Sequence, residues 1–340
     1  MVAQSCRQNC KKKTLKKKIF VLGGAGYVGS FLVPILLKKN YIVTVYDLFL
    51  YGDTIENNKN LKKIKGDLRN IDLLNNSIID HDIVIHLACI SNDPSFDLNP
   101  ELSKSINFDF FEDFVKISKE QGIKRFIYAS SSSVYGVKKE KEVDENFSLE
   151  PITDYSKFKV KCEEVLLKYF SNNFICSILR PATVCGYSKR QRLDLIVNIL
   201  TNVAYHTGKI IVDGGSQYRP NINIKDMCDA YVFFLDADEK LINGQIYNVG
   251  FENYTVNELA CMVQSVIGKK VEIVKNKLFD QRSYHISSKK ISKFLGFNPK
   301  FKIQSAIEDL KIAFDQNFLK DPLNNEMYFN IKRMKSINLS

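Results

Sequence analysis

Three side chains in the middle of the chain have the types and the spacing needed to move a proton. Tyr155 and Lys159 lie four residues apart where a helical pattern begins, so they share one helix face. A lysine ammonium beside a tyrosine, with the charge of an oxidised nicotinamide nearby, favours the phenolate and lowers the tyrosine pKa. Ser131 lies in a serine cluster that follows a strand pattern over residues 125–129. We expect Tyr155 to act as a general base, with Ser131 holding the substrate hydroxyl.

Three glycines near the start of the chain predict a turn that binds phosphates. The apolar run Ile19–Leu22 is typical of a buried parallel strand, and Gly23, Gly26 and Gly29 follow it before an apolar helical pattern. Glycine allows the tight turn and the close approach of a diphosphate to the backbone. Free N–H groups at the helix start then face the phosphates. An ordinary strand-to-helix turn is the alternative.

Asp47 follows the second strand pattern, residues 41–46, eighteen residues beyond Gly29. A carboxylate at this spacing accepts hydrogen bonds from the ribose hydroxyls of a dinucleotide and repels a 2′-phosphate. The position therefore favours NAD over NADP. The alternative is a solvated aspartate at the end of a strand.

Two further strand patterns, residues 61–65 and 83–89, deliver side chains to the same edge of the expected sheet. Ligands of α/β sheets bind at the carboxyl ends of the strands. Asp67 and Leu68, which follow the first pattern, are placed to contact an adenine ring. The alternative is that they belong to an ordinary loop. The residues expected at this edge are Asp67, Leu68, Leu87, Ala88 and Cys89.

The net charge of +11 is concentrated at the start of the chain. Residues 1–18 contain seven basic residues and no acidic one, which leaves +4 for the remainder. We expect a flexible, solvated lead, with attraction to polyanions as the alternative. No nucleic-acid-binding motif accompanies it, so we predict no specific nucleic-acid partner.

Bulk properties suit an ordinary globular protein of 340 residues. No apolar run approaches the roughly 20 residues of a membrane span, and the lead lacks the apolar core of a secretory signal. The eight cysteines lack the spacing of a metal site. We therefore predict no membrane span, no metal, and reduced thiols in the cytoplasm.

These motifs resemble those of the extended short-chain dehydrogenase/reductase superfamily, in its NAD-dependent nucleotide-sugar epimerase/dehydratase branch. The resemblance runs from Ile19 to about Asn317. In that family the glycine loop, the acid after the second strand, the serine or threonine before V-Y-G, and Y-x3-K all recur. They correspond here to Gly23, Gly26, Gly29, Asp47, Ser131, Tyr155 and Lys159. The resemblance implies bound NAD and a Rossmann-like, doubly wound parallel sheet with a smaller C-terminal α/β lobe for the substrate.

The same resemblance implies further contacts. Those expected at NAD are Tyr27, Val28, Asn107, Pro181 and Val184, together with Tyr155 and Lys159. Those expected at a nucleotide-diphosphate sugar are Ser132, Ser133, Arg192, Asn198, Arg219 and Arg282. Arg219 and Arg282 would clamp the diphosphate, since a planar guanidinium offers paired donors to phosphate oxygens. Arg190 is a further candidate.

The chain is expected to divide into four parts. They are the lead (1–18), an NAD-binding domain (19–185) to which later elements may return, a mainly substrate-binding lobe (186–320) and a tail (321–340) that packs on the body or on a neighbour. The helices beginning near Pro100 and Tyr155 form a two-fold interface in the family. We therefore expect a homodimer or higher homo-oligomer, although their apolar residues could instead face the sheet.

The residues beside Ser131 indicate the reaction. The family's 4,6-dehydratases carry an Asp-Glu pair after the threonine, because eliminating water needs an acid and a base beyond the tyrosine. Ser132 and Ser133 stand there instead, which disfavours dehydration. We expect hydride abstraction at sugar C4 by a 4-epimerase, and residues 190–198 resemble members acting on surface-polysaccharide precursors. A C4 dehydrogenase or 4-ketoreductase is the alternative, and a non-catalytic NAD-binding scaffold a remote one.

Overall fold

The computed structural model describes residues 16–91, 93–276 and 283–339. The predictions for Arg282 and for most of the basic lead fall outside these ranges. The centre of the fold is a seven-stranded sheet with the order β10-β6-β5-β4-β1-β2-β3, in which every pair is parallel. Its strands are β1 (Lys18–Leu22), β2 (Ile42–Asp47), β3 (Leu61–Lys65), β4 (Ile83–His86), β5 (Arg125–Ala129), β6 (Ile175–Pro181) and β10 (Gln245–Val249).

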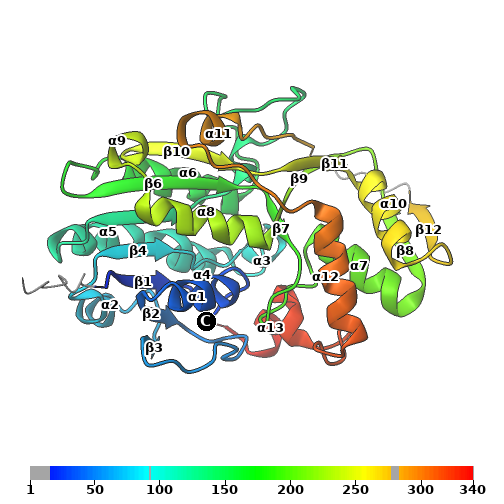
Figure 1. Ribbon diagram of the computed structural model, residues 1–340, viewed down its shortest axis with the longest axis horizontal. Coiled ribbons are helices and arrows are strands. Elements are labelled where there is room, and N and C mark those ends of the chain that lie inside the picture. Colours follow the sequence, from blue (N-terminus) through cyan, green and yellow to red (C-terminus); the bar gives the residue numbers. More distant parts are fainter. Residues whose placement is uncertain (1–15, 92, 277–282, 340) are drawn as a thin grey trace, which may run out of the picture.

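Helices cover both faces of this sheet (Figure 1). Alternate residues of β1 supply the two cores: Ile19 and Val21 pack on one face, and Phe20 and Leu22 on the other. The first face carries α1 (Gly29–Lys38), α8 (Ile224–Asp236) and α11 (Lys289–Leu295), and the second carries α2 (Ile71–Ile78), α5 (Phe111–Glu120) and α6 (Asp154–Leu166). The predicted doubly wound Rossmann-like fold is confirmed.

A smaller lobe stands beside the sheet and has its own core (Figure 1). Its helices are α7 (Ile196–Thr207), α10 (Val256–Ile267) and α12 (Ile303–Asp315), and its strands are β7 (Thr183–Cys185), β8 (Lys209–Asp213), β9 (Tyr218–Asn223), β11 (Glu252–Thr255) and β12 (Glu272–Asn276). Between them the chain returns to the large sheet, because β10 pairs with β6 and α8 packs against α1. The large sheet therefore includes residues from both sides of residue 185.

The segment expected as one helix after Pro100 is divided. It contains α4 (Pro100–Lys104), a π-helical turn (Ser105–Asp109) and α5. The apolar residues considered for a dimer interface, Phe110, Phe111, Phe114, Val165 and Leu166, are buried within the chain itself. They face the sheet, which was the alternative given above. The short helices are α3 (Asp93–Phe96), α9 (Glu239–Ile242) and the 3-10 turns Ser132–Tyr135 and Glu326–Tyr328.

A buried ion pair holds the strand ends behind the serine cluster. Arg180 at the end of β6 donates to Glu163 of α6 at 2.6 and 3.0 Å, and both side chains are almost fully buried. Glu163 also accepts a hydrogen bond from Ser130, and Arg180 donates to the Tyr135 hydroxyl at 2.8 Å. The ion pair thus fixes both ends of the serine segment.

The last described element, α13 (Asn330–Ser336), does not belong to the small lobe's core. Its Met334 is buried in the core that covers one face of the large sheet, and Arg333 donates to the carbonyl of Leu50 at 2.7 Å. The C-terminal segment (residues 321–339) therefore packs on the body of the same chain. No helix in the described ranges has the length and apolar character needed to cross a membrane.

Candidate active site

The glycine turn after β1 has no room for a side chain at Gly23 or Gly29. Gly23 has φ +78°, and a Cβ there would lie 2.5 Å from the backbone nitrogen of Ala88. A Cβ on Gly29 would lie 2.4 Å from the carbonyl oxygen of Gly24. The turn therefore packs closely against Ala88, which follows β4, and α1 begins at Gly29 with the N–H groups of its first turn. This is a cradle shaped for a diphosphate.

Asp47 ends β2 beside this turn. Its carboxylate accepts from the backbone N–H of Ala25 at 3.0 Å and of Phe49 at 2.8 Å, so it ties the turn to the strand end. Burial raises the pKa of Asp47, and these hydrogen bonds oppose the rise. Because a carboxylate has about four acceptor positions, two remain for ribose hydroxyls on the cavity side.

A cavity of about 1210 Å³ joins this edge of the sheet to the small lobe. Its volume exceeds the upper end of ordinary small-molecule sites, roughly 1,000 Å³, and suits two ligands together. Most of the residues predicted to contact ligands line it: Gly23, Gly26, Tyr27, Val28, Gly29, Asp47, Leu68, Leu87, Ala88, Cys89, Ser131, Ser132, Ser133, Tyr155, Pro181, Val184, Arg192 and Arg219.

Two asparagines predicted to contact ligands instead brace loops. Asn107, in the π-helical turn, accepts from the N–H of Ile90 at 2.8 Å and donates to its carbonyl at 3.0 Å. Asn198 accepts from the N–H of Gly186 and donates to the carbonyl of Arg192. Neither is among the residues that line the cavity, because the backbone of the neighbouring loops occupies their amides.

Asp67 and Lys159 also lie off the cavity wall. Asp67 pairs with Arg69 at 2.7 Å, so its carboxylate is held at the loop and Leu68 alone faces the cavity. Lys159 is buried behind Tyr155, with its Nζ 5.8 Å from the centre of the Tyr155 ring. It donates to the carbonyl of Ala129 at 2.7 Å. Lys159 therefore joins α6 to the end of β5.

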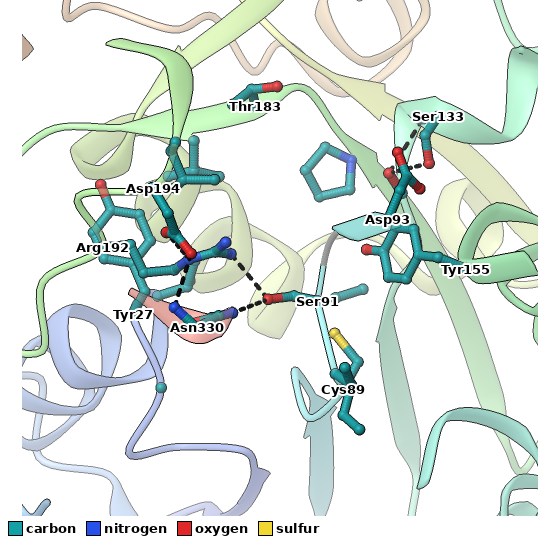
Figure 2. A pocket seen from close by; sticks show the side chains of 18 of the residues that line it. Tyr27, Cys89, Ser91, Asp93, Ser133, Tyr155, Thr183, Arg192, Asp194 and Asn330 are labelled. Atoms are coloured by element: carbon teal, nitrogen blue, oxygen red, sulfur yellow. Dashed lines mark hydrogen bonds and ion pairs between the residues drawn. The ribbon is translucent and has the colours of Figure 1, made fainter. Parts of the chain in front are cut away.

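Local capping aims Tyr155 into the cavity. Thr153 caps α6 by accepting from the N–H of Ser156, which places Tyr155 in the first helical turn. The Thr153 hydroxyl also donates to the carboxylate of Asp93 at 2.6 Å. Figure 2 shows the side chains of Tyr155, Asp93 and Ser133 gathered on one side of the cavity.

Ser131 lies two residues after β5 and caps the 3-10 turn Ser132–Tyr135. Its Oγ accepts from the N–H of Ser133 at 3.1 Å and lies 2.9 Å from the Ser133 hydroxyl. Ser131 and Tyr155 both line the cavity, and the Ser131 hydroxyl lowers the pKa of Tyr155. The predicted proton-transfer pair is therefore brought together.

The pKa of Tyr155 differs from the prediction. Burial raises it well above the ordinary 10.0, and the charge of Asp93 adds to the rise, while Ser131 and Arg192 lower it. The sequence predicted a lowered pKa from the adjacent Lys159 together with the charge of an oxidised nicotinamide. In the protein alone, the desolvation of the phenol outweighs that effect, and the Lys159 ammonium is directed to a backbone carbonyl.

Several residues at the site were missed by the sequence analysis. Asp93 lines the cavity beside Tyr155. The sequence feature that could have identified it is an acidic residue shortly after the end of β4. Ser91, Asp194 and Asn330 line the opposite side with Arg192 (Figure 2). Asn330 carried no signal, because it lies 239 residues from Ser91 in the sequence.

Comparison with known proteins identifies the family. A model described as the NAD dependent epimerase/dehydratase family matches residues 19–250, more than half of the chain. The chain belongs to this family. It is therefore an NAD-dependent enzyme of the short-chain dehydrogenase/reductase type, and the predicted cofactor is confirmed.

Relatives of this chain are described as catalysing different reactions. The chain is 28% identical to a putative UDP-glucose 4-epimerase of Methanocaldococcus jannaschii over 298 residues, 85% of this chain and 96% of that one. It is 26% identical to the human dTDP-D-glucose 4,6-dehydratase over 325 residues, 89% and 91% of the two chains. The UDP-glucuronic acid 4-epimerase of Bacillus cereus, solved with UDP-glucuronic acid and NAD, has a TM-score of 0.78 at 26% identity, covering 88% and 99%.

In this family member the glycine turn and Asp47 fit NAD. The cradle that excludes a Cβ at Gly23 would hold the diphosphate, Asp47 the ribose hydroxyls, and Leu68 the adenine. When bound, NAD accepts a hydride from carbon and can return it.

Replacing Gly23 with alanine is expected to weaken NAD binding about 10- to 100-fold, as roughly 1–3 kcal/mol of overpacking would do. The added methyl would collide with the Ala88 backbone beside the diphosphate cradle. Titration with NADH, followed by its fluorescence, measures the effect. Gly122 has the same φ of +78° with nothing within 4 Å, so Gly122→Ala controls for backbone strain. Equal NAD affinity in the two variants would contradict the assignment.

Proposed function

We propose that the enzyme is a nucleotide-sugar 4-epimerase that supplies precursors for surface polysaccharide. The observation that carries the proposal is the composition of the cavity at the serine cluster. Ser131 and Tyr155 line the same cavity as the glycine turn. Ser132 and Ser133 occupy the positions at which a dehydratase needs its acid and base. Asp93, at the start of α3, supplies one carboxylate near Tyr155.

The side chains suit reversible oxidation of an alcohol. Ser131 would orient the C4 hydroxyl, and Tyr155 would take its proton while the hydride leaves the same carbon for NAD. Lys159, buried behind the ring, would stabilise the phenolate. Tyr155 would return the proton to the C4 oxygen once this carbon is reduced from its opposite face. The net reaction inverts C4 and consumes no cofactor.

The substrate side of the proposal rests on the arginine and serine side chains of the cavity. Arg219 of β9 lines it from the small lobe and is suited to a phosphate group. The epimerases among the relatives, described as acting on UDP-glucose, make a UDP-hexose the first substrate to test. We further propose a homodimer, and a cytoplasmic location because the six described cysteines are free thiols.

The decisive experiment separates the possible reactions by product. Purified protein is denatured to release NAD(H), and then native protein is offered UDP-, GDP-, CDP- and dTDP-hexoses. The proposal expects tightly held cofactor, a C4 isomer as product, and no net change in the absorbance of reduced nicotinamide. Stoichiometric NADH would identify a dehydrogenase, and a 4-keto-6-deoxy product a dehydratase. NAD binding without turnover of any of these sugars would favour a scaffold.

A further inference from the structure

Two buried arginines lie on the cavity wall in the loop that leads into the small lobe. This arginine loop, residues 187–195, carries Arg190 and Arg192, which are only 4% and 7% exposed. Burial lowers the pKa of Arg190 to about 10, although the guanidinium stays charged at neutral pH. Buried cations are costly unless an anion accompanies them.

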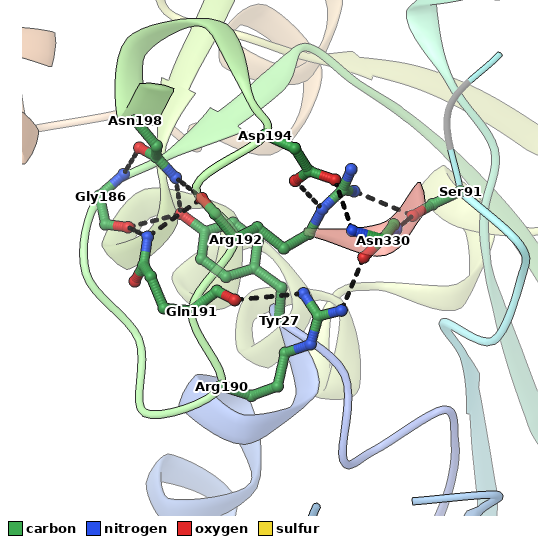
Figure 3. Close-up of polar contacts among 9 residues, drawn as sticks. All are labelled: Tyr27, Ser91, Gly186, Arg190, Gln191, Arg192, Asp194, Asn198 and Asn330. Carbon is green, nitrogen blue, oxygen red and sulfur yellow. Dashed lines mark hydrogen bonds and ion pairs between the residues drawn. The ribbon is translucent and has the colours of Figure 1, made fainter. Parts of the chain in front are cut away.

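The arginine loop is fastened to α13 by a network of hydrogen bonds (Figure 3). Arg190 donates to the side-chain oxygen of Asn330 at 2.7 Å, and Arg192 donates to Asp194 and to the Ser91 hydroxyl, both at 2.9 Å. Asn330 then donates its backbone N–H to Asp194 at 3.0 Å and its side-chain amide to Ser91 at 3.1 Å. Asn330 of α13 thus accepts from Arg190 and is bonded to both partners of Arg192, Asp194 and Ser91.

This network leaves donors unused. Nε of Arg190 and Nη2 of Arg192 are buried and have no hydrogen-bond partner among the described residues. Asp194 accepts from Arg192 and from the backbone N–H of Asn330. The charges of Asp194 and Asp47 also act on Arg190, although Figure 3 shows no hydrogen bond between Asp194 and Arg190. Since buried donors are normally paired, the arrangement has both the charge and the free N–H groups to take an anion from the cavity.

The arginine loop is hydrogen-bonded to the glycine turn and to the start of α1. The backbone N–H of Arg190 donates to the Ser30 hydroxyl in the first turn of α1 at 3.3 Å. The Ser188 hydroxyl lies 2.7 Å from that of Ser30 and donates to the carbonyl of Tyr27 at 3.0 Å. These contacts place the backbone of the arginine loop beside the start of α1, where a bound diphosphate would lie.

The C-terminal segment also lines the part of the cavity where Leu68 is expected to contact adenine. Met334 and Leu339 line it and pack in the same apolar cluster as Leu68. Arg333 of the same helix is bonded to the carbonyl of Leu50, in the loop that follows β2. α13 therefore spans the adenine side, the loop after β2 and the arginine loop. The family match ends at residue 250, well before this helix.

We propose that Arg190 and Arg192 bind the diphosphate of NAD, and that Asn330 locks them over it so that α13 retains the cofactor. This reassigns Arg192, which the sequence analysis placed at the sugar substrate. It deepens the proposed function, because a 4-epimerase must return the hydride from the same cofactor molecule that received it. Retention of NAD is measurable whether or not the sugar reaction is the one proposed.

The arginine part is tested by ligand binding to full-length protein freed of nucleotide. Arg190→Met and Arg192→Met should each weaken NAD and ADP about 10-fold or more, the usual effect of losing a hydrogen bond to a charged group, and leave adenosine unchanged. Lys189→Met removes an exposed charge from the same loop and should change none of the three. Arg190→Lys and Arg192→Lys keep the charge and should recover part of the ADP affinity, which gives a readout if the methionine variants fail to fold.

Binding of UDP shows whether the arginines serve the diphosphate of NAD or that of the nucleotide-sugar substrate. If the arginine variants lose affinity for UDP while binding NAD and ADP normally, the arginines serve the substrate and the proposal is overturned. It is equally overturned if Arg190→Met and Lys189→Met bind NAD alike.

The locking part is tested by the rate at which NADH leaves the protein. Asn330→Ala should speed dissociation several-fold, about 3- to 10-fold for one hydrogen-bonding group, with little change in the rate of binding. Asn324→Ala, an exposed asparagine of the same segment, is the matched control. Equal dissociation rates in these two variants would remove α13 from cofactor retention.

Discussion

Replacing Tyr155 with phenylalanine is expected to lower kcat by about 10²- to 10⁴-fold, the usual contribution of a positioned acid–base group. The ring would still fill its place at the start of α6, because Tyr155 is buried and Phe differs only by the hydroxyl. NAD binding should stay within about 2-fold of the parent, since the diphosphate cradle is untouched. Turnover of the nucleotide sugar and NADH titration, done on the same preparation, measure both quantities.

The pH dependence gives this prediction a second readout. Burial raises the pKa of Tyr155, so the phenol holds its proton at neutral pH in the protein alone. The rate should therefore rise with pH as the phenolate forms, and Tyr155→Phe should remove this rise. Ser131→Ala keeps the base and should keep the pH dependence while lowering kcat. A fully active Tyr155→Phe enzyme would contradict the proposed proton transfer. If the variant lost NAD binding as well as turnover, Tyr155 would have a structural role instead.

Arg180→Met is expected to be the most destabilising single substitution proposed for this chain. It would leave the Glu163 carboxylate buried without its cation, and breaking such a pair costs about 3–5 kcal/mol. The pair is 2% and 3% exposed, so water cannot take the place of the guanidinium. The midpoint of urea unfolding is the measurement. Because Glu163 also holds Ser130, the folded fraction should lose activity as well.

The double variant Arg180→Met/Glu163→Leu is the control for this prediction. Removing both charges leaves no buried ion, and comparable replacements are often neutral or even stabilising. We expect most of the lost stability to return, although Ser130 and Tyr135 would each lose a partner. If the double variant is as unstable as Arg180→Met, the loss comes from packing and not from the stranded carboxylate.

The site residues that could be predicted are those whose positions follow from short, local sequence patterns. The glycine spacing, the acid after β2 and the Tyr155–Lys159 pair each lie within one strand-turn-helix unit. Their neighbours along the chain determine where they stand, so Gly23, Asp47 and Tyr155 all reach the cavity wall as expected.

The parts that could not be predicted depend on distant backbone. Asn107 and Asn198 are short polar side chains whose partners are loop N–H and carbonyl groups, and no pattern shows which loop approaches them. The contact between Arg190 and Asn330 joins residues 140 apart in sequence. The direction of the Tyr155 pKa shift depends on how deeply the finished fold buries the ring.

The return of β10 to the large sheet also bears on how the protein is made. A ribosome has to synthesise the small lobe's β8 and β9 before β10 emerges to pair with β6. Until then β6 is an edge strand with unpaired backbone groups, which favours association with other nascent chains. The amino-terminal half should consequently aggregate when expressed alone, and chaperones should be needed most between the synthesis of β6 and that of β10.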